Sequence, residues 1–145
     1  MSTRTQVQVK SGAEKITLYH HTDGYPEYML PLIQKAWREY GTGWEGARVG
    51  KVASMLCAVD PVVFEPEAGQ ALHGDIEYYY VIDCKDTAHV GTTPDWTVTS
   101  YSVNFDFEGK LSRKKRLNEM GKIKVSKIDE KYINNLQPSL EDNAY

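Results

Sequence analysis

The segment "LYHHTDGYPEY", residues 18–28, concentrates side chains that can carry out acid–base chemistry. Such catalysis needs an imidazole within reach of a positioned carboxylate. His21 and Asp23 lie two residues apart, so in an extended chain their side chains point to the same side. Glu27 follows four residues later and adds a second carboxylate. If the protein is an enzyme, this pattern predicts a hydrolase or phosphodiesterase that uses His21, Asp23 and Glu27.

The same segment offers ligands for a metal ion, because imidazole and carboxylate together suit zinc, manganese or iron. His20 and His21 are adjacent, however, and adjacent side chains on a strand point to opposite faces, so only one of them can join a given site. The other histidines, His73 and His89, are isolated in the sequence. We therefore predict no metal site and no cofactor, and we expect the purified protein to contain no stoichiometric metal.

A structural role explains much of the same segment. Asp23-Gly24 is a turn pair in which Asp23 caps the turn or helix and Gly24 takes a positive φ, and Pro26 is typical of a helix start. On this interpretation, Asp23→Ala and Gly24→Val should lower stability rather than remove one specific activity. His21 and Tyr25 can still bind a ligand from such a loop, so the structural and binding hypotheses are compatible.

A second dense stretch is "HGDIEYYYVI", residues 73–82, which alternates as a strand does. The alternation places Ile76, Tyr78 and Tyr80 on one face, and Glu77 and Tyr79 on the other. A core strand that begins after a turn at Asp75 is the simplest interpretation. The alternative is functional, because Tyr79 on an exposed face can contact a ligand and a tyrosine-rich strand can form an oligomer interface.

Charge is distributed unevenly along the chain. Residues 1–107 carry a net charge of −6, whereas residues 108–131 carry +5 and include the run "SRKKR" at 112–116. Arg113, Lys114 and Arg116 can bind phosphate or another anion, and together with Tyr79 they suit a nucleotide. A solvated helix face, or pairing with the acidic body of the same or a sister chain, explains the run equally well. We do not expect sequence-specific DNA binding, since no recognition motif accompanies the cations.

Hydrophobic periodicity predicts the elements that hold these residues. Alternation over 5–10 and 14–21 predicts a β-hairpin that turns near Ser11-Gly12. Helical spacing over 28–40 predicts a helix that ends at Gly41, and Pro31 requires this helix to begin near Tyr28 or to kink. Further elements are predicted as a helix at 48–59, strands at 75–84 and 96–107, a helix at 110–120 and an edge strand at 122–128.

This order predicts an α+β fold: an antiparallel sheet with two main helices packed on one face, followed by the basic C-terminal segment. A parallel pair of strands is compatible with it, because the connection through both helices is long enough for a crossover. We expect one domain over residues 1–131 and a polar C-terminal tail over 132–145.

Composition narrows the protein class further. The chain is 41% hydrophobic, which suffices for a core, yet no run approaches the roughly 18 apolar residues that a membrane span needs. The start of the chain lacks a hydrophobic signal segment. Cys57 and Cys84 lie in apolar contexts and are predicted to be two unpaired thiols. We expect a cytoplasmic protein with no membrane partner.

Two stretches, "YHHTDGYPEYMLPLI" and "HGDIEYYYVI", together resemble small proteins of prokaryotes, their viruses and integrated elements that have no assigned activity. Those proteins show a Tyr-x-His-x-Asp-Gly-Tyr-Pro segment before a helix and a later Gly-Asp-Ile-Glu-Tyr strand. The resemblance covers residues 16–84 and implies phage biology, such as blocking a bacterial defence system from within the host cytoplasm.

The leading hypothesis is therefore a small phage-related binding protein. It would bind a host protein or sequester an anionic ligand such as a nucleotide, without turnover, through the residues His21, Tyr25, Tyr79, Arg113, Lys114 and Arg116. The alternatives are the hydrolase described above and an oligomeric structural or interaction module that assembles through its tyrosine-rich strand.

Overall fold

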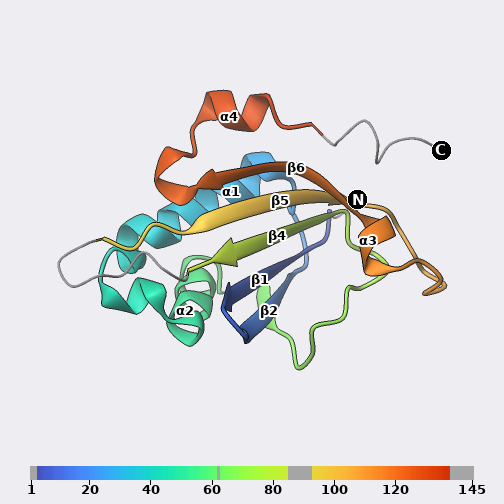
Figure 1. The fold of residues 1–145 in the computed structure, drawn as a ribbon, viewed down its shortest axis with the longest axis horizontal. Coiled ribbons are helices and arrows are strands. Elements are labelled where there is room, and N and C mark those ends of the chain that lie inside the picture. The colour runs from blue at the N-terminus through green and yellow to red at the C-terminus, as the bar shows by residue number, and fades with distance from the viewer. Residues whose placement is uncertain (1–2, 62, 85–92, 138–145) are drawn as a thin grey trace.

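The computed structural model describes residues 3–61, 63–84 and 93–137, which form a six-stranded sheet with helices. The strands lie in the order β3-β2-β1-β4-β5-β6 (Figure 1). Their bounds are Thr5–Ser11 (β1), Glu14–His20 (β2), Phe64–Pro66 (β3), Tyr78–Asp83 (β4), Thr97–Val103 (β5) and Leu117–Lys124 (β6). Neighbouring strands are antiparallel except β1 and β4, which are parallel. The predicted α+β class is confirmed.

β1 and β2 form the predicted hairpin. Ser11 pairs with Glu14, and Gly12 in the turn between them has a φ of +62°, a value that glycine adopts without a Cβ penalty. The predicted split of the two histidines is also present. His20 is fully buried on the side of the sheet that faces the helices, whereas His21 is exposed on the opposite side.

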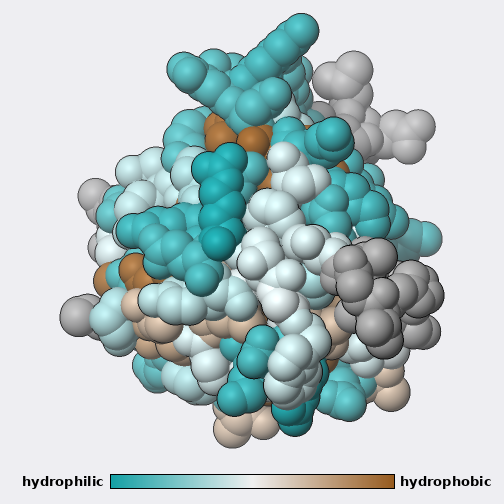
Figure 2. All heavy atoms as spheres, turned by 90° about the vertical axis from the view of Figure 1, so that its left-hand side faces the viewer, coloured by the Kyte–Doolittle hydropathy of each residue, from teal (hydrophilic) through white to brown (hydrophobic). Residues whose placement is uncertain are grey.

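Two helices cover one face of the sheet (Figure 1). α1 (Pro26–Ala36) continues into a π-helical turn, η1 (Trp37–Gly41), and a 3-10 turn, η2 (Trp44–Ala47), leads into α2 (Val49–Val59). The main core forms where the two helices meet the sheet, and its fully buried members include Val7, Leu18, Leu30, Ile33, Val52, Leu56, Tyr80, Ile82, Trp96 and Val98. Figure 2 views the α2 end of the molecule, where hydrophobic groups appear only as small, separated patches on a hydrophilic surface.

α1 confirms one part of its prediction and differs from another. It begins at Pro26, the residue predicted to be typical of a helix start, rather than near Tyr28, and Pro31 lies inside it. A proline at this position removes the hydrogen bond that the Glu27 carbonyl would accept. Both Pro31 and Glu27 are exposed, so water can satisfy that carbonyl and the helix tolerates the loss.

The tyrosine-rich strand β4 lies between β1 and β5, so both of its edges are paired within the chain. Tyr79 and Tyr80 are 1% and 0% exposed. Ile76, which was predicted to share a face with Tyr80, instead precedes the strand and packs with Tyr79 on the other side of the sheet. Burial of these tyrosines leaves them unavailable to an oligomer interface.

The predicted helix over 110–120 is wrong. Only Arg113–Arg116 form a single helical turn, α3, and Leu117–Lys124 form the edge strand β6. Pairing with β5 outweighs helical spacing here, because the exposed cations supply no apolar face for a helix to bury. The edge strand predicted over 122–128 overlaps β6, but β6 both begins and ends earlier, at Leu117 and Lys124, and residues 125–127 form a 3-10 turn.

The chain continues after β6 through a 3-10 turn, η3 (Val125–Lys127), into α4 (Glu130–Asn134). Asp129 caps α4 by accepting a hydrogen bond from the Tyr132 amide, and Ile133 is buried against the main core. The predicted boundary between residues 131 and 132 therefore falls inside a packed helix, and the folded part extends beyond it.

Candidate functional site

The face of the sheet opposite α1 and α2 carries polar side chains and a small second hydrophobic cluster around Ile76 and Tyr79, and it is only partly covered. Residues 67–76 cross its β2–β1 half as a strap. The Gln6 amide donates to the Glu67 carboxylate at 3.0 Å and to the Ala71 carbonyl at 3.1 Å. The Gln70 side-chain oxygen accepts from Thr17 at 2.6 Å and from Gln8 at 3.2 Å. These side-chain contacts hold the strap on the sheet and leave the β4–β5–β6 half open.

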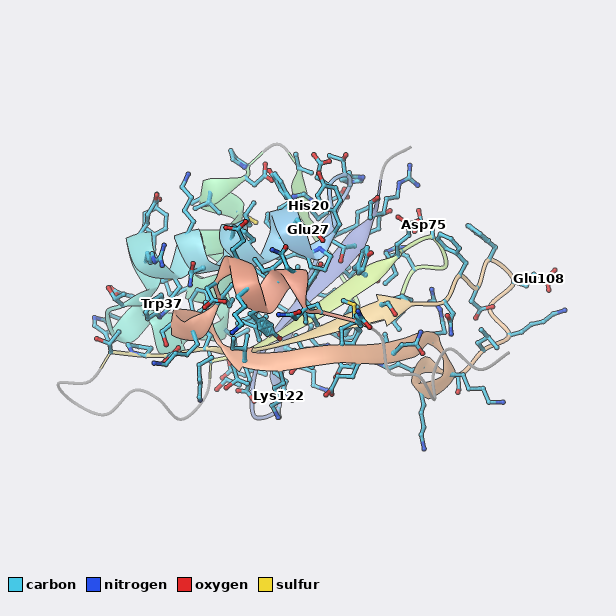
Figure 3. All side chains as sticks on the ribbon, turned by 90° about the horizontal axis from the view of Figure 1, so that it is seen from above. His20, Glu27, Trp37, Asp75, Glu108 and Lys122 are labelled. Atoms are coloured by element: carbon cyan, nitrogen blue, oxygen red, sulfur yellow. The ribbon has the colours of Figure 1, made fainter. Side chains whose placement is uncertain are left out.

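The open half forms a cavity of about 350 Å³ beside the strap, here called the sheet-face cavity. Strand register places its lining side chains in rows, because alternate residues of each strand share a face. Across β1, β4, β5 and β6 the rows are Gln6–Tyr79–Tyr101–Glu119, Gln8–Val81–Thr99–Lys122 and Lys10–Asp83–Thr97–Lys124. Gln6 and Lys124 belong to these rows but do not line the cavity. In Figure 3, Lys122 lies on this side of the sheet, whereas His20, Glu27 and Trp37 lie on the side of the helices.

Arg113 and Tyr79 form the best-defined feature of the cavity. The Arg113 guanidinium donates to the Tyr79 hydroxyl at 2.6 Å and to the Gln70 carbonyl at 3.3 Å, and it lies 5.1 Å from the centre of the Tyr79 ring. Two of its five N–H groups are thus used within the chain. Burial raises the pKa of Tyr79, so the hydroxyl stays protonated while it accepts the hydrogen bond from Arg113.

The side chains of Lys10 and Lys122 contribute two further positive charges to the cavity. In the described part of the chain, neither Lys10 nor Lys122 has a hydrogen-bond or ion-pair partner for its side chain. With Arg113 they supply three cations, against the carboxylates of Asp83 and Glu119. The cavity therefore carries a small net positive charge on an otherwise acidic body, and it favours ligands with anionic groups.

Arg116 and Lys114 do not join this cavity. The Arg116 side chain is buried and donates to the carbonyl oxygens of Asn104, Leu72 and His73, so it fastens the strap to the β5–β6 connection. Burial lowers the pKa of Arg116. Lys114 is exposed and has no side-chain partner among the described residues. The cations of this one helical turn therefore lie in three different environments: Arg113 at the cavity, Lys114 in solvent and Arg116 buried against the strap.

The candidates from the first histidine-rich segment are also dispersed. His21 lies 3.2 Å from the Glu65 carboxylate and packs edge-on to Tyr19 at 4.6 Å. The Tyr25 hydroxyl donates to Asp23 at 3.3 Å. Glu27 lines a separate recess beside Pro31, and among the described residues no hydrogen bond or ion pair joins any two of the three catalytic candidates. None of these residues lines the sheet-face cavity.

The turn before α1 works differently from its prediction. Asp23, not Gly24, has the positive φ, at +53°, and the N-cap of α1 is Tyr25 without a side-chain hydrogen bond. Gly24 is required for space instead, because a Cβ there would lie 2.7 Å from the Cβ of Thr5. The Gly24 amide donates to the Thr3 carbonyl, and its carbonyl accepts from the Tyr80 hydroxyl at 2.8 Å.

We expect Asp23→Gly to leave stability unchanged or to raise it by up to about 1 kcal/mol, because glycine adopts positive φ freely. Gly24→Val should cost about 1–3 kcal/mol by overpacking against β1. Urea denaturation of both variants measures these effects. A loss of several kcal/mol for Asp23→Gly would restore the capping role that the sequence predicted for this carboxylate.

A contact not anticipated from the sequence lies beneath α1. Fully buried His20 places Nε2 2.8 Å from Oδ2 of Asp60, and the Tyr28 hydroxyl donates to the same oxygen at 3.0 Å. His20 Nδ1 is buried without a partner among the described residues. In the sequence, Asp60 stands out only as the residue that follows α2, and nothing in the sequence pairs it with His20. The arrangement ties β2 to both helices.

Sequence reasoning also missed several residues of the sheet-face cavity, namely Lys10, Thr99, Tyr101, Glu119 and Lys122. Alternation along a strand indicates which residues share a face, but it does not indicate which strands are neighbours. Among the described residues, no cluster of three or more histidine, cysteine, aspartate or glutamate side chains could hold a metal ion. Cys57 and Cys84 are free thiols.

The comparisons with known proteins return no relative. No protein-family model matches the chain, and neither a curated protein nor a solved structure matches it. No helix among the described residues combines the length and apolar character needed to span a membrane.

Proposed function

We propose that the protein binds a small anionic ligand with an aromatic group, of which a nucleotide is the simplest example, and that it does so without turnover. The proposal rests on the Arg113–Tyr79 pair at the edge of the sheet-face cavity. The guanidinium is held in place before a ligand arrives, and this lowers the entropic cost of binding.

The surrounding groups fit the two parts of such a ligand. Lys10, Lys122 and the remaining N–H groups of Arg113 suit phosphate oxygens. The Tyr101 ring, with its centre 5.9 Å from that of Tyr79, offers an aromatic surface for a base, and Thr97 and Thr99 offer hydroxyl groups. Binding without turnover is supported by the position of His21, Asp23 and Glu27 outside the cavity.

The resemblance to small proteins of prokaryotes and their viruses suggests a biological setting for this binding. A phage protein of this kind would lower the free concentration of a nucleotide signal that a bacterial defence system uses. Binding of a host defence protein and hydrolysis by His21, Asp23 and Glu27 remain alternative hypotheses.

Titration calorimetry at low salt, with a panel of nucleoside phosphates, cyclic dinucleotides and inorganic phosphate, tests the proposal. We expect the variant Lys10→Glu/Lys122→Glu to bind the best ligand of the panel about tenfold to a hundredfold more weakly, because two charge-assisted contacts become repulsive. Chromatography of the ligand after incubation should recover it unchanged.

The matched control is Lys35→Glu/Lys127→Glu, which changes the net charge equally at exposed lysines outside the cavity. It should bind like the parent protein. An equal loss of affinity in both double variants would show that binding follows net charge, and no binding by the parent to any member of the panel would reject the proposal. Cleavage of the ligand would favour the hydrolase.

A further inference from the structure

The connection between β5 and α3, residues 104–112, exposes apolar side chains; it is here called the aromatic loop. Phe105, Phe107 and Leu111 are 50%, 77% and 41% exposed. The two phenyl rings stack on each other, with centres 5.5 Å apart and planes 20° from parallel. The loop extends from one end of the molecule, and Glu108 marks its tip in Figure 3.

The aromatic loop is held in its shape by its own hydrogen bonds. The Asp106 carboxylate accepts from the amides of Lys110 and Leu111, each at 2.9 Å, and these bonds hold the pKa of Asp106 below its usual range. The Asp106 amide donates to the carbonyl of Gly74 in the strap at 3.1 Å, and Gly109 has a φ of +70°. A loop ordered in this way presents its phenyl rings without a large entropic cost on binding.

Basic side chains flank these rings. Lys114 and Lys115 in the first turn after the loop are exposed, and Lys110 forms an exposed ion pair with Glu108. Aromatic groups beside cations fit an apolar recess with an acidic rim. Glu108 at the tip, next to Phe107, would be repelled by an anionic membrane surface, so such a surface is a poor partner for the aromatic loop.

Such a recess exists on the same chain, between α1 and α4, and is here called the α1–α4 groove. It has a volume of about 340 Å³, enough for a phenyl ring. Its apolar groups come from Pro31, Ile128 and Ile133. Its acidic groups come from Glu27, Asp129 and Glu130. In the part of the chain that the structure describes, neither Glu27 nor Glu130 has an ion-pair or hydrogen-bond partner for its side chain.

The loop and the groove of one chain lie apart. α4 follows the C-terminal end of β6, whereas the aromatic loop lies beside α3 at the N-terminal end of β6 (Figures 1 and 3). A groove can therefore be filled by the loop of a second molecule but not by its own.

We propose that the protein self-associates head to tail, with Phe107 of one copy in the α1–α4 groove of the next and Lys114 and Lys115 facing its acidic rim. A contact of this kind is heterologous, so it extends into rings or chains instead of stopping at a symmetric dimer. A single loop in a single groove buries less than a standard interface, so the association is weak and salt-dependent. The proposal does not depend on ligand binding, because Lys10 and Lys122 lie on neither surface.

Sedimentation velocity of the full chain, from roughly 10 to 500 µM, measures the association. We expect the average sedimentation coefficient to rise with concentration at low salt and to fall back at about 0.5 M salt. Phe107→Ser removes the phenyl ring of the loop, and Glu130→Lys reverses a charge on the rim of the groove. Each variant alone should abolish the rise of the sedimentation coefficient with concentration. Trp44→Ser is the matched control, because Trp44 is 63% exposed and lies on neither surface, and it should associate like the parent.

Mixing the two inactive variants gives the decisive measurement. The Phe107→Ser chain keeps an intact groove and the Glu130→Lys chain keeps an intact loop, so the mixture should form a 1:1 dimer that cannot extend. A parent protein that stays monomeric over the whole range, a Phe107→Ser variant that still associates, or a mixture that stays monomeric would each overturn the proposal.

Discussion

Arg116→Ala is expected to lower the free energy of unfolding by about 2–4 kcal/mol. This loss is larger than the sequence suggests, because a run of adjacent cations is typical of a solvated surface. The Arg116 guanidinium donates to the carbonyl oxygens of His73 at 2.9 Å, Asn104 at 3.0 Å and Leu72 at 3.4 Å. Removing it leaves these acceptors without their donor and releases the strap from the β5–β6 connection. Chemical denaturation followed by tryptophan fluorescence measures the loss.

Two comparisons make this result specific. Arg116→Lys should recover only part of the lost stability, because one ammonium cannot reproduce the planar fork that reaches several carbonyls. Lys114→Ala should change stability by less than about 0.5 kcal/mol, since its exposed side chain has no partner among the described residues. If Arg116→Ala unfolds like the parent yet loses ligand affinity, Arg116 is the ligand-binding residue that the sequence predicted.

Asp60→Ala is expected to have the largest effect on stability, about 3–5 kcal/mol, because one carboxylate oxygen serves two donors. His20 Nε2 and the Tyr28 hydroxyl both lie within hydrogen-bonding distance of Oδ2. His20 is fully buried, so without Asp60 its imidazole would have no polar partner on either nitrogen among the described residues. The cost is that of an unsatisfied buried donor plus the lost bond to Tyr28.

Tyr28→Phe provides the matched comparison for Asp60. It removes one of the two donors at a partly exposed hydroxyl and should cost only about 1 kcal/mol. Thermal and urea denaturation of both variants measure the difference. A small loss for Asp60→Ala, together with loss of a specific activity, would identify His20 and Asp60 as a functional pair and not a structural one.

The sequence by itself determined the elements with strong local signals. Alternation and a glycine turn gave the β1–β2 hairpin and placed His20 and His21 on opposite faces. Apolar spacing gave two helices, and the second ends at Val59, as predicted. These features depend on residues close together in the chain, where backbone geometry and burial of one face act in the same direction.

Some local assignments failed because distant contacts decided them. Residues 117–120 have helical spacing, yet pairing with β5 makes them part of β6. Gly24 was expected to serve through its φ, whereas its role depends on the approach of Thr5 from another strand. In both cases, the free energy of a long-range contact exceeds a local preference of about 1 kcal/mol or less.

The candidate site was decided by tertiary structure alone. The sequence named Tyr79 and Arg113 among the binding residues, but it could not show that they meet at 2.6 Å or that Lys10 and Lys122 share their face of the sheet. It also grouped Arg116 with Arg113, although one is buried under the strap and the other borders the cavity. Side-chain alternation gives each strand two faces, but only the order of the strands, with β4 inserted between β1 and β5, determines which side chains become neighbours.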